Sequence, residues 1–537
     1  MSFDCSSVLE PWSAGQAMVL PLFGLICALP LAPLLRRFYS RRMVALMSLA
    51  EVAAPLSAEV PKSPVPVLSS SNEPSLAQCV RQRHVRLVRA SLIAWLCANA
   101  VALVMVAAHV FYGVTPTSYL FWLVLVCSPF LVNLQWQSTR RAVLLIGIGA
   151  AASVLQVLFG HEDTLGYSLS MRLANYLVMV LVFYLATAHR TLRAIVIFAG
   201  IVAIGTVVGI YMAVVADALM TCLHPFPRAG LSLALTNMTT LSLAVVIIGL
   251  FAGLSFVPLL IIERWLRRGW LSDTLTFAAL ALTFLFATVM GTSTFALVPR
   301  LALLALWLAA VGAAYAVALR ASRWPRKART LLVLRVFSRD HRSEKALDAL
   351  QSRWQLAGPV VQIGGPDLMA LNFGLGQFIR FATFRVDHLF QATAQQARGL
   401  FHGLDPNPDF EGRFRLHEVF CTNSAWRVAV EQLVDRVDAV LLDVRGFGNH
   451  REGTMYEVEL LARSGRLPQT VGLFDAETDW DCFERHAAAS GALQALAGRI
   501  DARSPNAIDA CFQRLLAIAD RPDTSSLSAP ASEGSRL

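Results

Sequence analysis

Residues 437–457 of this chain read VDAVLLDVRGFGNHREGTMYE, and this stretch decides the fold of the segment around it. Its first seven residues contain the apolar run Ala439–Leu442, which is typical of a strand buried on both faces. A polar loop with glycines follows, and the residues from Thr454 onward favour a helix. A strand, a loop and a helix in this order predict one βα unit of a parallel sheet.

The same alternation continues on both sides of this unit, across residues 326–520. Further strands are predicted at 331–337, 360–364, 415–421 and 471–474. Helices are predicted at 343–355, 424–436, 454–463, 479–497 and 506–519. Residues 367–409 predict a helix-containing insertion, and the Ser/Pro-rich residues 521–537 predict a disordered tail. Residues 326–520 are therefore expected to form an α/β domain, a parallel sheet with helices on both faces.

Polar residues cluster after three of the predicted strands, where an open α/β sheet binds its ligands. No GxGxxG or GxxxxGK[ST] motif is present, so neither a Rossmann dinucleotide fingerprint nor a P-loop is expected. Glycines in such loops let a ligand approach the backbone closely. The candidate ligand-binding residues are Ser338, Arg339 and Asp340 after the first strand, Gly364 and Gly365 after the second, and Asp443, Arg445, Gly446, Gly453 and Thr454 after the strand at 437–443.

Glu457 is the candidate catalytic residue, because it lies one helical turn beyond the last of these loops and is expected to face back toward it. A carboxylate there could hold ribose hydroxyls or stabilise an oxocarbenium-like centre, as carboxylates do at glycosidic bonds. Thr454 would cap the helix, whose N-terminus could receive a phosphate. Alternatively, Thr454 and Glu457 form a T-x-x-E capping box with a purely structural role. The residues leave both interpretations open.

Asp443 ends a buried apolar strand, so its carboxylate needs a partner or a role in the site. Arg339 and Arg445 have an alternative interpretation as surface ion pairs, which are frequent and weak. Trp426 is expected in the core rather than as a stacking platform. The nine cysteines form no CxxC or CxxH pair, so we expect reduced packing residues and no metal site.

The chain before Arg320 has a different character. The whole sequence of 537 residues is 56% hydrophobic and 15% charged, whereas about 25% of residues are charged in soluble domains. Residues 1–325 carry 21 Lys and Arg against 10 Asp and Glu, while residues 326–537 carry 25 against 26. The positive excess thus lies in the apolar half, where basic loops set membrane orientation. The α/β half has no excess of basic residues, which a nucleic-acid-binding domain would be expected to carry.

Residues 1–320 are expected to form a polytopic α-helical membrane domain with about nine spans. Basic and acid-leaning loops alternate between the spans, which predicts an integral cell-membrane protein with its N-terminus outside and its α/β domain in the cytoplasm. A Pro/Ser-rich cytoplasmic segment at 43–80 is expected to be a flexible linker. The predicted spans lie at 16–35, 91–112, 117–136, 141–160, 172–188, 194–215, 239–262, 271–290 and 300–319.

The residues Ser338-Arg339-Asp340, the segment GPVVQIGG at 358–365 and the segment DAVLLDVRGFGNHREGTMYEVELL at 438–461 together resemble the TIR-like branch of the flavodoxin-like fold. They are also similar to nucleoside 2-deoxyribosyltransferase-like domains, which carry a GTxxE-type motif at this point. The resemblance covers roughly residues 330–475. The insertion at 367–409, and Tyr456 where Trp is common, depart from the family pattern.

This resemblance implies that Glu457 is the catalytic residue of N-glycosidic cleavage, acting on NAD or a nucleoside. It also implies that Ser338, Arg339 and Asp340 line the phosphate or ribose side of the ligand, and that the domain acts by self-association into a homo-oligomer. No cofactor is expected other than the nucleotide that serves as substrate or ligand.

Three functions are compatible with the sequence. In the first, a membrane-anchored signalling or defence protein binds and hydrolyses NAD or a related nucleotide. In the second, the same domain is a non-enzymatic nucleotide-sensing or protein-interaction module on a membrane sensor. The third is a transporter with a regulatory domain, which usually needs an intramembrane ionisable group; no Asp or Glu lies in the middle of a predicted span.

Overall fold

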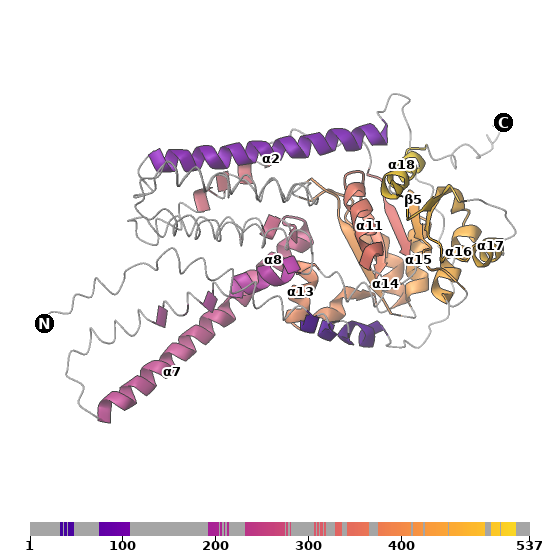
Figure 1. Cartoon of the computed structure of the whole chain (residues 1–537). Helices are drawn as coiled ribbons and strands as arrows, with labels where there is room; N and C mark the ends of the chain where they lie inside the picture. Colours follow the sequence, from indigo (N-terminus) through magenta and orange to yellow (C-terminus); the bar gives the residue numbers. More distant parts are fainter. Residues whose placement is uncertain are drawn as a thin grey trace, which may run out of the picture. The chain divides into compact units, whose positions relative to one another are not determined.

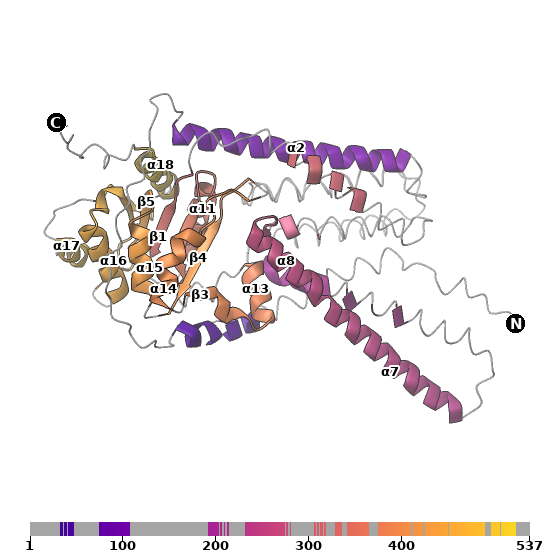
Figure 2. The same ribbon diagram turned by 180° about the vertical axis from the view of Figure 1, so that it is seen from behind.

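The computed structural model falls into two compact units (Figures 1 and 2). The helical unit comprises Met1–Tyr39, Leu87–Ala321 and Ala370–Arg385, and the α/β unit comprises Ser40–Arg86, Ser322–Met369 and Val386–Leu537. The structure describes residues 33–35, 37–39, 41–47, 75–107, 192–202, 231–273, 275–277, 328–335, 341–364, 374–391, 393–409, 412–422, 425–448, 451–488, 496–504 and 506–521, with single positions between 205 and 213, at 280 and between 305 and 317.

The α/β unit is built on a seven-stranded sheet in which every neighbouring pair of strands is parallel. Three of its strands are buried along their whole length, as expected where helices cover both faces. The predicted α/β class with a parallel sheet is therefore confirmed. The strands are β1 (Leu331–Arg335), β2 (Val360–Gly364), β3 (Phe390–Gln391), β4 (Leu416–Cys421), β5 (Ala439–Asp443), β6 (Thr470–Phe474) and β7 (Gly498–Asp501).

Helices and short 3₁₀ turns connect the strands. The helices are α11 (His341–Trp354), α14 (Ala394–Gly399), α15 (Trp426–Val434), α16 (Glu452–Arg463), α17 (Trp480–Ala488) and α18 (Ala507–Ala519), and the turns are η2 (Val386–Leu389), η3 (Leu400–Gly403) and η4 (Leu467–Gln469). Two strands were not predicted: β3 has only two residues, and β7 is half-buried and carries two charged residues. Such strands lack the apolar run on which sequence analysis depends.

The strand order is β3-β4-β2-β1-β5-β6-β7. Taken alone, β2, β1, β5, β6 and β7 follow the 2-1-3-4-5 order of flavodoxin-like sheets, which is consistent with the expected fold. When β4 beyond β2 is included, the order becomes the 3-2-1-4-5-6 order of dinucleotide-binding sheets, and β3 adds an edge strand. In both descriptions the chain changes direction across the sheet between β1 and β5, and this switch point is where such sheets bind ligands.

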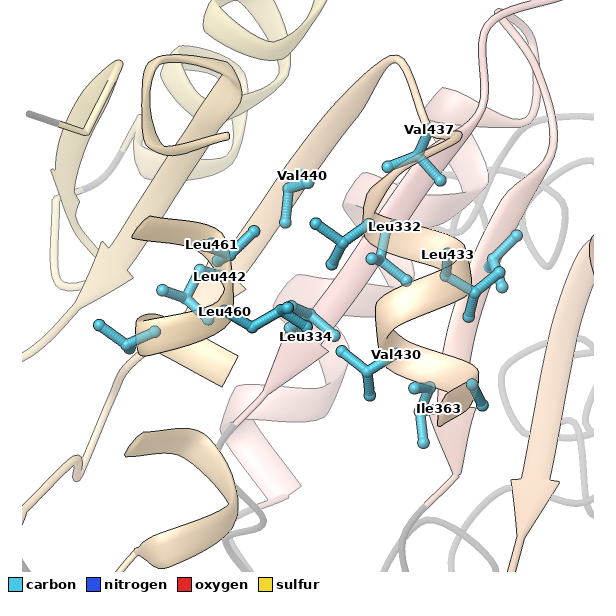
Figure 3. Close-up of a cluster of buried hydrophobic side chains, with 14 of the residues drawn as sticks. Leu332, Leu334, Ile363, Val430, Leu433, Val437, Val440, Leu442, Leu460 and Leu461 are labelled. Carbon is cyan, nitrogen blue, oxygen red and sulfur yellow. The ribbon is translucent and has the colours of Figure 1, made fainter. Parts of the chain in front are cut away.

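Two helix layers sandwich the sheet. Helices α14 to α17 cover one face, where apolar side chains of β1, β2 and β5 pack with those of α15 and α16 (Figure 3). Helices α11 and α18 cover the other face, where Trp354 and Phe512 meet edge to face with ring centroids 6.4 Å apart. Successive residues of one strand therefore face opposite helix layers. The labelled side chains of the first layer are Leu332, Leu334, Ile363, Val430, Leu433, Val437, Val440, Leu442, Leu460 and Leu461.

In the helical unit the described elements are most of α2 (Leu76–Ala107), α7 (Leu231–Leu254), α8 (Phe256–Arg268) and α13 (Leu375–Ala382). Among the described residues one helix, Leu241–Arg268, has the length and apolar composition needed to cross a membrane. The predicted span at 239–262 falls largely on this helix. The predicted spans at 117–136, 141–160 and 172–188 lie outside the described residues, as do nearly all of the tail at 521–537 and most of the linker at 43–80. The remaining predicted spans are described only in part.

Helix α13 lies within the predicted insertion at 367–409, yet it belongs to the helical unit. It packs against α8, where Arg380 Nε lies 3.0 Å from Glu263 Oε1. At its start, the Leu375 N–H donates to the Asp273 carboxylate over 3.1 Å. The rings of Phe378 and Phe198 meet edge to face at 5.0 Å. The described part of the insertion contains helices, as predicted, but one of them, α13, is held by the helical unit.

Candidate functional site

The carboxyl ends of β1 and β5 bring two charged residues together at the switch point of the sheet. Arg335 is the last residue of β1 and lies in register with Asp443, the last residue of β5. Both are buried. Residues in register on adjacent parallel strands point to the same face of the sheet. Arg335 was predicted only as part of a buried strand, although a charged residue in an apolar run was the available signal of a role.

Asp443 and Arg445 form a buried, two-pronged ion pair. Arg445 Nε donates to Asp443 Oδ1 over 2.7 Å, and Arg445 Nη2 donates to Asp443 Oδ2 over 2.6 Å. The two side chains are only 6% and 10% exposed, so the pair is not the surface ion pair considered for Arg445. Asp443 thus has the partner that its burial requires.

The loop after β5 is fixed by the loop after β6. Gly446 has φ of +63°, a conformation that favours glycine. Its N–H donates to the Asp475 carboxylate over 3.2 Å. The Thr478 hydroxyl donates to the Val444 carbonyl over 2.9 Å, and the Asp479 N–H donates to the Phe447 carbonyl over 3.0 Å. The described part of this loop is therefore held in one shape. The role of Asp475 was not predicted, since no pattern in the sequence links it to this loop.

The capping interpretation of Thr454 is wrong. Helix α16 begins at Glu452, and its N-cap residue is Arg451, which makes no side-chain capping bond. Thr454 is consequently inside the first turn, where its hydroxyl does not act as an N-cap for the following N–H groups. The T-x-x-E pair with Glu457 is not a capping box, and this structural alternative for Glu457 is removed.

Glu457 lies on the buried side of α16 and is 5% exposed. Among the residues that the structure describes, its Oε2 atom has no hydrogen-bond partner. Burial raises the pKa of Glu457 to about 8. Buried carboxyl groups normally have partners, and an unpartnered one with a shifted pKa marks a candidate functional residue.

The charged pair and Glu457 lie on opposite sides of the sheet. The side chain of Leu442 belongs to the core under α15 and α16, so that of the next residue, Asp443, faces the α11–α18 layer. In agreement, the charges of Asp443 and Arg445 influence the pKa of Cys511 in α18, which burial raises to about 12. Glu457 belongs to α16 on the other layer. A ligand that contacts both groups must therefore cross the carboxyl edge of the sheet.

Next to Glu457, an aromatic cluster joins the starts of α15 and α16. The rings of Trp426 and Tyr456 meet edge to face at 5.3 Å. The Arg427 guanidinium lies 5.0 Å from the centre of the Tyr456 ring. The Tyr456 hydroxyl donates to Glu431 Oε1 over 2.5 Å. Trp426 is partly buried against the core, as expected. Tyr456, which the sequence marked only as a departure from the family pattern, packs against the same core.

The glycines of the candidate site have different environments. A Cβ added at Gly364 would lie 2.4 Å from the Phe420 ring, so packing alone accounts for this glycine. Within the described part of the chain, a Cβ added at Gly453 would meet only Trp426, at 4.0 Å, so packing against these residues does not account for the glycine. Ser338, Arg339, Asp340 and Gly365 lie outside the described residues. Ligand binding by all of these residues stays a prediction.

No protein-family model, curated protein or solved structure matches the chain. Within the described part of the chain, no group of three or more His, Cys, Asp or Glu side chains is arranged to hold a metal ion. The site is therefore defined by its own geometry: a topological switch point, a fixed glycine loop and a buried, unpartnered glutamate on the helix that follows.

Proposed function

We propose that the chain is a membrane-anchored signalling or defence protein whose TIR-like α/β unit binds NAD or a related nucleotide and cleaves its N-glycosidic bond. The observation that carries this proposal is Glu457, buried on α16 with Oε2 unpartnered. A ligand that brings a positive charge or a hydrogen-bond donor to this carboxyl group would provide the partner that the unliganded protein lacks.

The chemistry follows from what a buried carboxylate stabilises. When the bond between the ribose C1′ and the base nitrogen breaks, its electron pair leaves with the base and the sugar becomes an oxocarbenium-like cation. A carboxylate of Glu457 near that cation lowers the barrier, because an opposite charge acts strongly in a water-poor site. Water then adds to C1′ and loses a proton, which passes to solvent when neutral nicotinamide leaves NAD and to the departing base when the substrate is a nucleoside. Free base and the ribosyl product remain.

Binding of the nucleotide is supported by the switch point between β1 and β5. Gly453, exposed at the start of α16, leaves room for a phosphate or ribose close to the helix N-terminus. Arg335 and the Asp443–Arg445 pair lie at the same carboxyl edge of the sheet, on the face opposite to Glu457. Self-association through the α/β unit is part of the proposal, on the family resemblance alone.

Membrane anchoring is supported by the helix Leu241–Arg268. Its apolar side chains project outward, with Leu241, Val246 and Leu250 between 58% and 65% exposed. A helix that exposes apolar residues in this way is stable in lipid and costly in water. We propose that it is one span of a polytopic domain of about nine spans, with the α/β unit in the cytoplasm.

The test is release of free base by the full chain. The purified chain in lipid nanodiscs is incubated with NAD and with nucleosides, and released base is measured by chromatography. Glu457→Gln, which keeps the side-chain shape, should abolish release. The matched control is Glu459→Gln on the same helix, a half-exposed carboxyl whose Oε1 lies 2.7 Å from His486 Nδ1 and which should retain activity. Equal rates in the Glu457→Gln variant and the unmodified chain would exclude the catalytic role.

A second candidate function is nucleotide sensing without turnover. The 3-2-1-4-5-6 strand order favours it, because that order supports dinucleotide binding independently of Glu457. Calorimetry on the full chain separates the two functions: binding of NAD without base release would establish the sensor, and no binding would exclude both.

A further inference from the structure

Phe384, which follows α13 in the helical unit, is unusual in two respects. It is the most exposed large apolar side chain among the described residues, at 94%. It is also the one non-glycine residue there with a positive φ, +59°. Residues with a Cβ avoid this left-handed region, and bulky residues avoid it most. Folding of the unit alone explains neither the strain nor the exposure.

The turn at Phe384 has the same hydrogen bonds as the turn that ends α8. The N–H groups of Phe384 and Arg385 donate to the Phe381 and Arg380 carbonyls over 3.1 and 2.7 Å. This is a Schellman motif, whose left-handed position is usually glycine. In the turn after α8 that position is Gly269, with φ of +76°. Glycine would therefore relieve the strain at 384.

The direction of α13 along α8 points its C-terminal end, where Phe384 follows, toward the apolar part of the candidate span Leu241–Arg268. Helix α13 lies beside α8 (Figure 1). A Cβ added at Gly376 would lie 3.9 Å from Leu266, and Arg380 pairs with Glu263, so the two helices run in opposite directions. Phe384 comes one turn after Arg380. It is consequently displaced from Glu263 toward the start of α8, which is the C-terminal part of the helix Leu241–Arg268.

The other end of α8 is basic and aromatic. Arg264, Trp265, Arg268 and Trp270 are exposed there, and Arg268 lies 5.4 Å from the centre of the Trp270 ring. Glu263, the one acidic residue of α8, is buried and paired with Arg380 and Arg267. The exposed end of the helix thus offers cations and tryptophans, which is the composition found at lipid headgroups.

We propose that the α8–α13 pair docks on an anionic phospholipid surface, with the Phe384 ring inserted at the edge of the acyl chains and Arg264 and Arg268 on the lipid phosphates. The inference rests on the proposed membrane anchoring. Insertion covers an exposed aromatic ring, and the left-handed turn directs that ring outward from α13. The strain at 384 is then retained for binding to lipid rather than for folding.

Position-specific photocrosslinking tests the insertion. The full chain carrying Phe384→p-benzoylphenylalanine is reconstituted in vesicles of phosphatidylcholine with one third phosphatidylglycerol and irradiated. We expect adducts with lipid. The same replacement at Asn407, an exposed residue of the α/β unit, is the control and should give fewer. Adducts with a second copy of the chain, or no lipid adducts at 384, would overturn the proposal.

Two further variants test the parts separately. The variant Phe384→Gly removes both the backbone strain and the ring. If only the strain mattered, it should raise the unfolding midpoint in anionic nanodiscs by about 2 °C or more. If the ring is inserted in lipid, the loss of its burial cancels this gain, so a rise in the midpoint overturns the proposal.

The double variant Arg264→Gln/Arg268→Gln tests the contact with lipid phosphates. We expect the ratio of phosphatidylglycerol to phosphatidylcholine adducts at position 384 to fall about fivefold or more. Arg485→Gln/Arg521→Gln, with the same charge change in the α/β unit, should leave this ratio unchanged. An unchanged ratio in the Arg264→Gln/Arg268→Gln variant would also overturn the proposal.

Failure of the anchoring and failure of this inference give different results. If alkaline carbonate washes the chain from the vesicles, the proposed membrane anchoring is wrong. If the chain remains in the bilayer but gives no lipid adducts at 384, only the docking of α8 and α13 is wrong.

Discussion

Glu457 is buried without a partner for Oε2, and this makes the stability of the protein depend on pH. Its pKa is about 8 in the folded chain and 4.5 ordinarily. Between these values the unfolded chain releases a proton that the folded chain keeps, so stability falls as pH rises from 4.5 to 8. The loss is on the order of 5 kcal/mol at pH 8 and above, and is absent below pH 4.5.

Glu457→Gln should therefore be more stable than the unmodified chain at pH 8, with the difference vanishing toward pH 4.5. Denaturant unfolding of the full chain across this pH range measures it. Glu459→Gln is the control, because that carboxyl is half-exposed and paired with His486. If the free energy of unfolding changes with pH equally in the Glu457→Gln variant and the unmodified chain, this carboxyl is not buried without a partner.

The same pKa predicts the pH dependence of catalysis. In the proposed mechanism the carboxylate form of Glu457 is active, and burial keeps this group protonated below about pH 8. We expect kcat/KM for base release to rise about tenfold per pH unit up to pH 8 and then level off. A rate that falls across the same range would instead assign Glu457 the role of a general acid.

Gly364 and Gly453 form a matched pair for testing ligand approach. Gly364→Ala places a Cβ 2.4 Å from the Phe420 ring, so we expect a loss of about 1–3 kcal/mol in stability. Gly453→Ala meets no such contact and should stabilise α16 by up to about 1 kcal/mol. If a nucleotide approaches Gly453, the second variant should nevertheless bind it more weakly in calorimetry. Unchanged affinity would remove Gly453 from the site.

At the scale of elements, the ion pair between Arg380 and Glu263 holds α13 on α8 at side-chain exposures of 18% and 5%. Breaking it leaves a buried charge without one of its partners, which costs up to about 3 kcal/mol at such a site. Arg380→Gln should therefore loosen α13 and speed tryptic cleavage at Arg385. The exposed pair of Arg353 with Asp509 supplies the control, since Arg353→Gln should change little. Equal cleavage rates in the Arg380→Gln variant and the unmodified chain would contradict this anchoring.

Sequence patterns predicted elements where burial is continuous. The strands around 331–337, 360–364 and 437–443 were found because helices cover both of their faces, which forces apolar runs. β3 and β7 were missed because an edge position relaxes that demand. The loop after 437–443 was recognised from its glycines, but the start of α16 at Glu452 was not, because Thr454 imitates an N-cap. The shape of the loop itself depends on tertiary contacts, those of Gly446 with Asp475 and of Val444 with Thr478, which no local pattern shows.

At the scale of the whole molecule, the division between units does not follow the change in composition at Arg320. Ser40–Arg86 groups with the α/β unit, and Ala370–Arg385 groups with the helical unit. Arg83 illustrates the cause: its Nε donates to the Gly412 carbonyl over 2.7 Å and its guanidinium lies 4.6 Å from the centre of the Phe414 ring. The amino-acid composition of a segment indicates whether its surroundings are apolar or aqueous. It does not indicate which unit the segment packs against, because that depends on long-range contacts in the folded chain. Each half thus supplies a segment to the other unit.

The proposed topology predicts that the two ends of the chain lie on opposite sides of the bilayer. An odd number of spans puts the chain ends on opposite sides of the bilayer, and the basic loops place the C-terminal end in the cytoplasm. In right-side-out vesicles, protease should remove an epitope tag at the N-terminus and leave one at the C-terminus intact, with the reverse result in inverted vesicles. Detergent should expose both tags, which controls for protease resistance. Tags that respond together would require an even number of spans, and a C-terminal tag outside would separate the α/β unit from the cytoplasmic NAD that the proposed function needs.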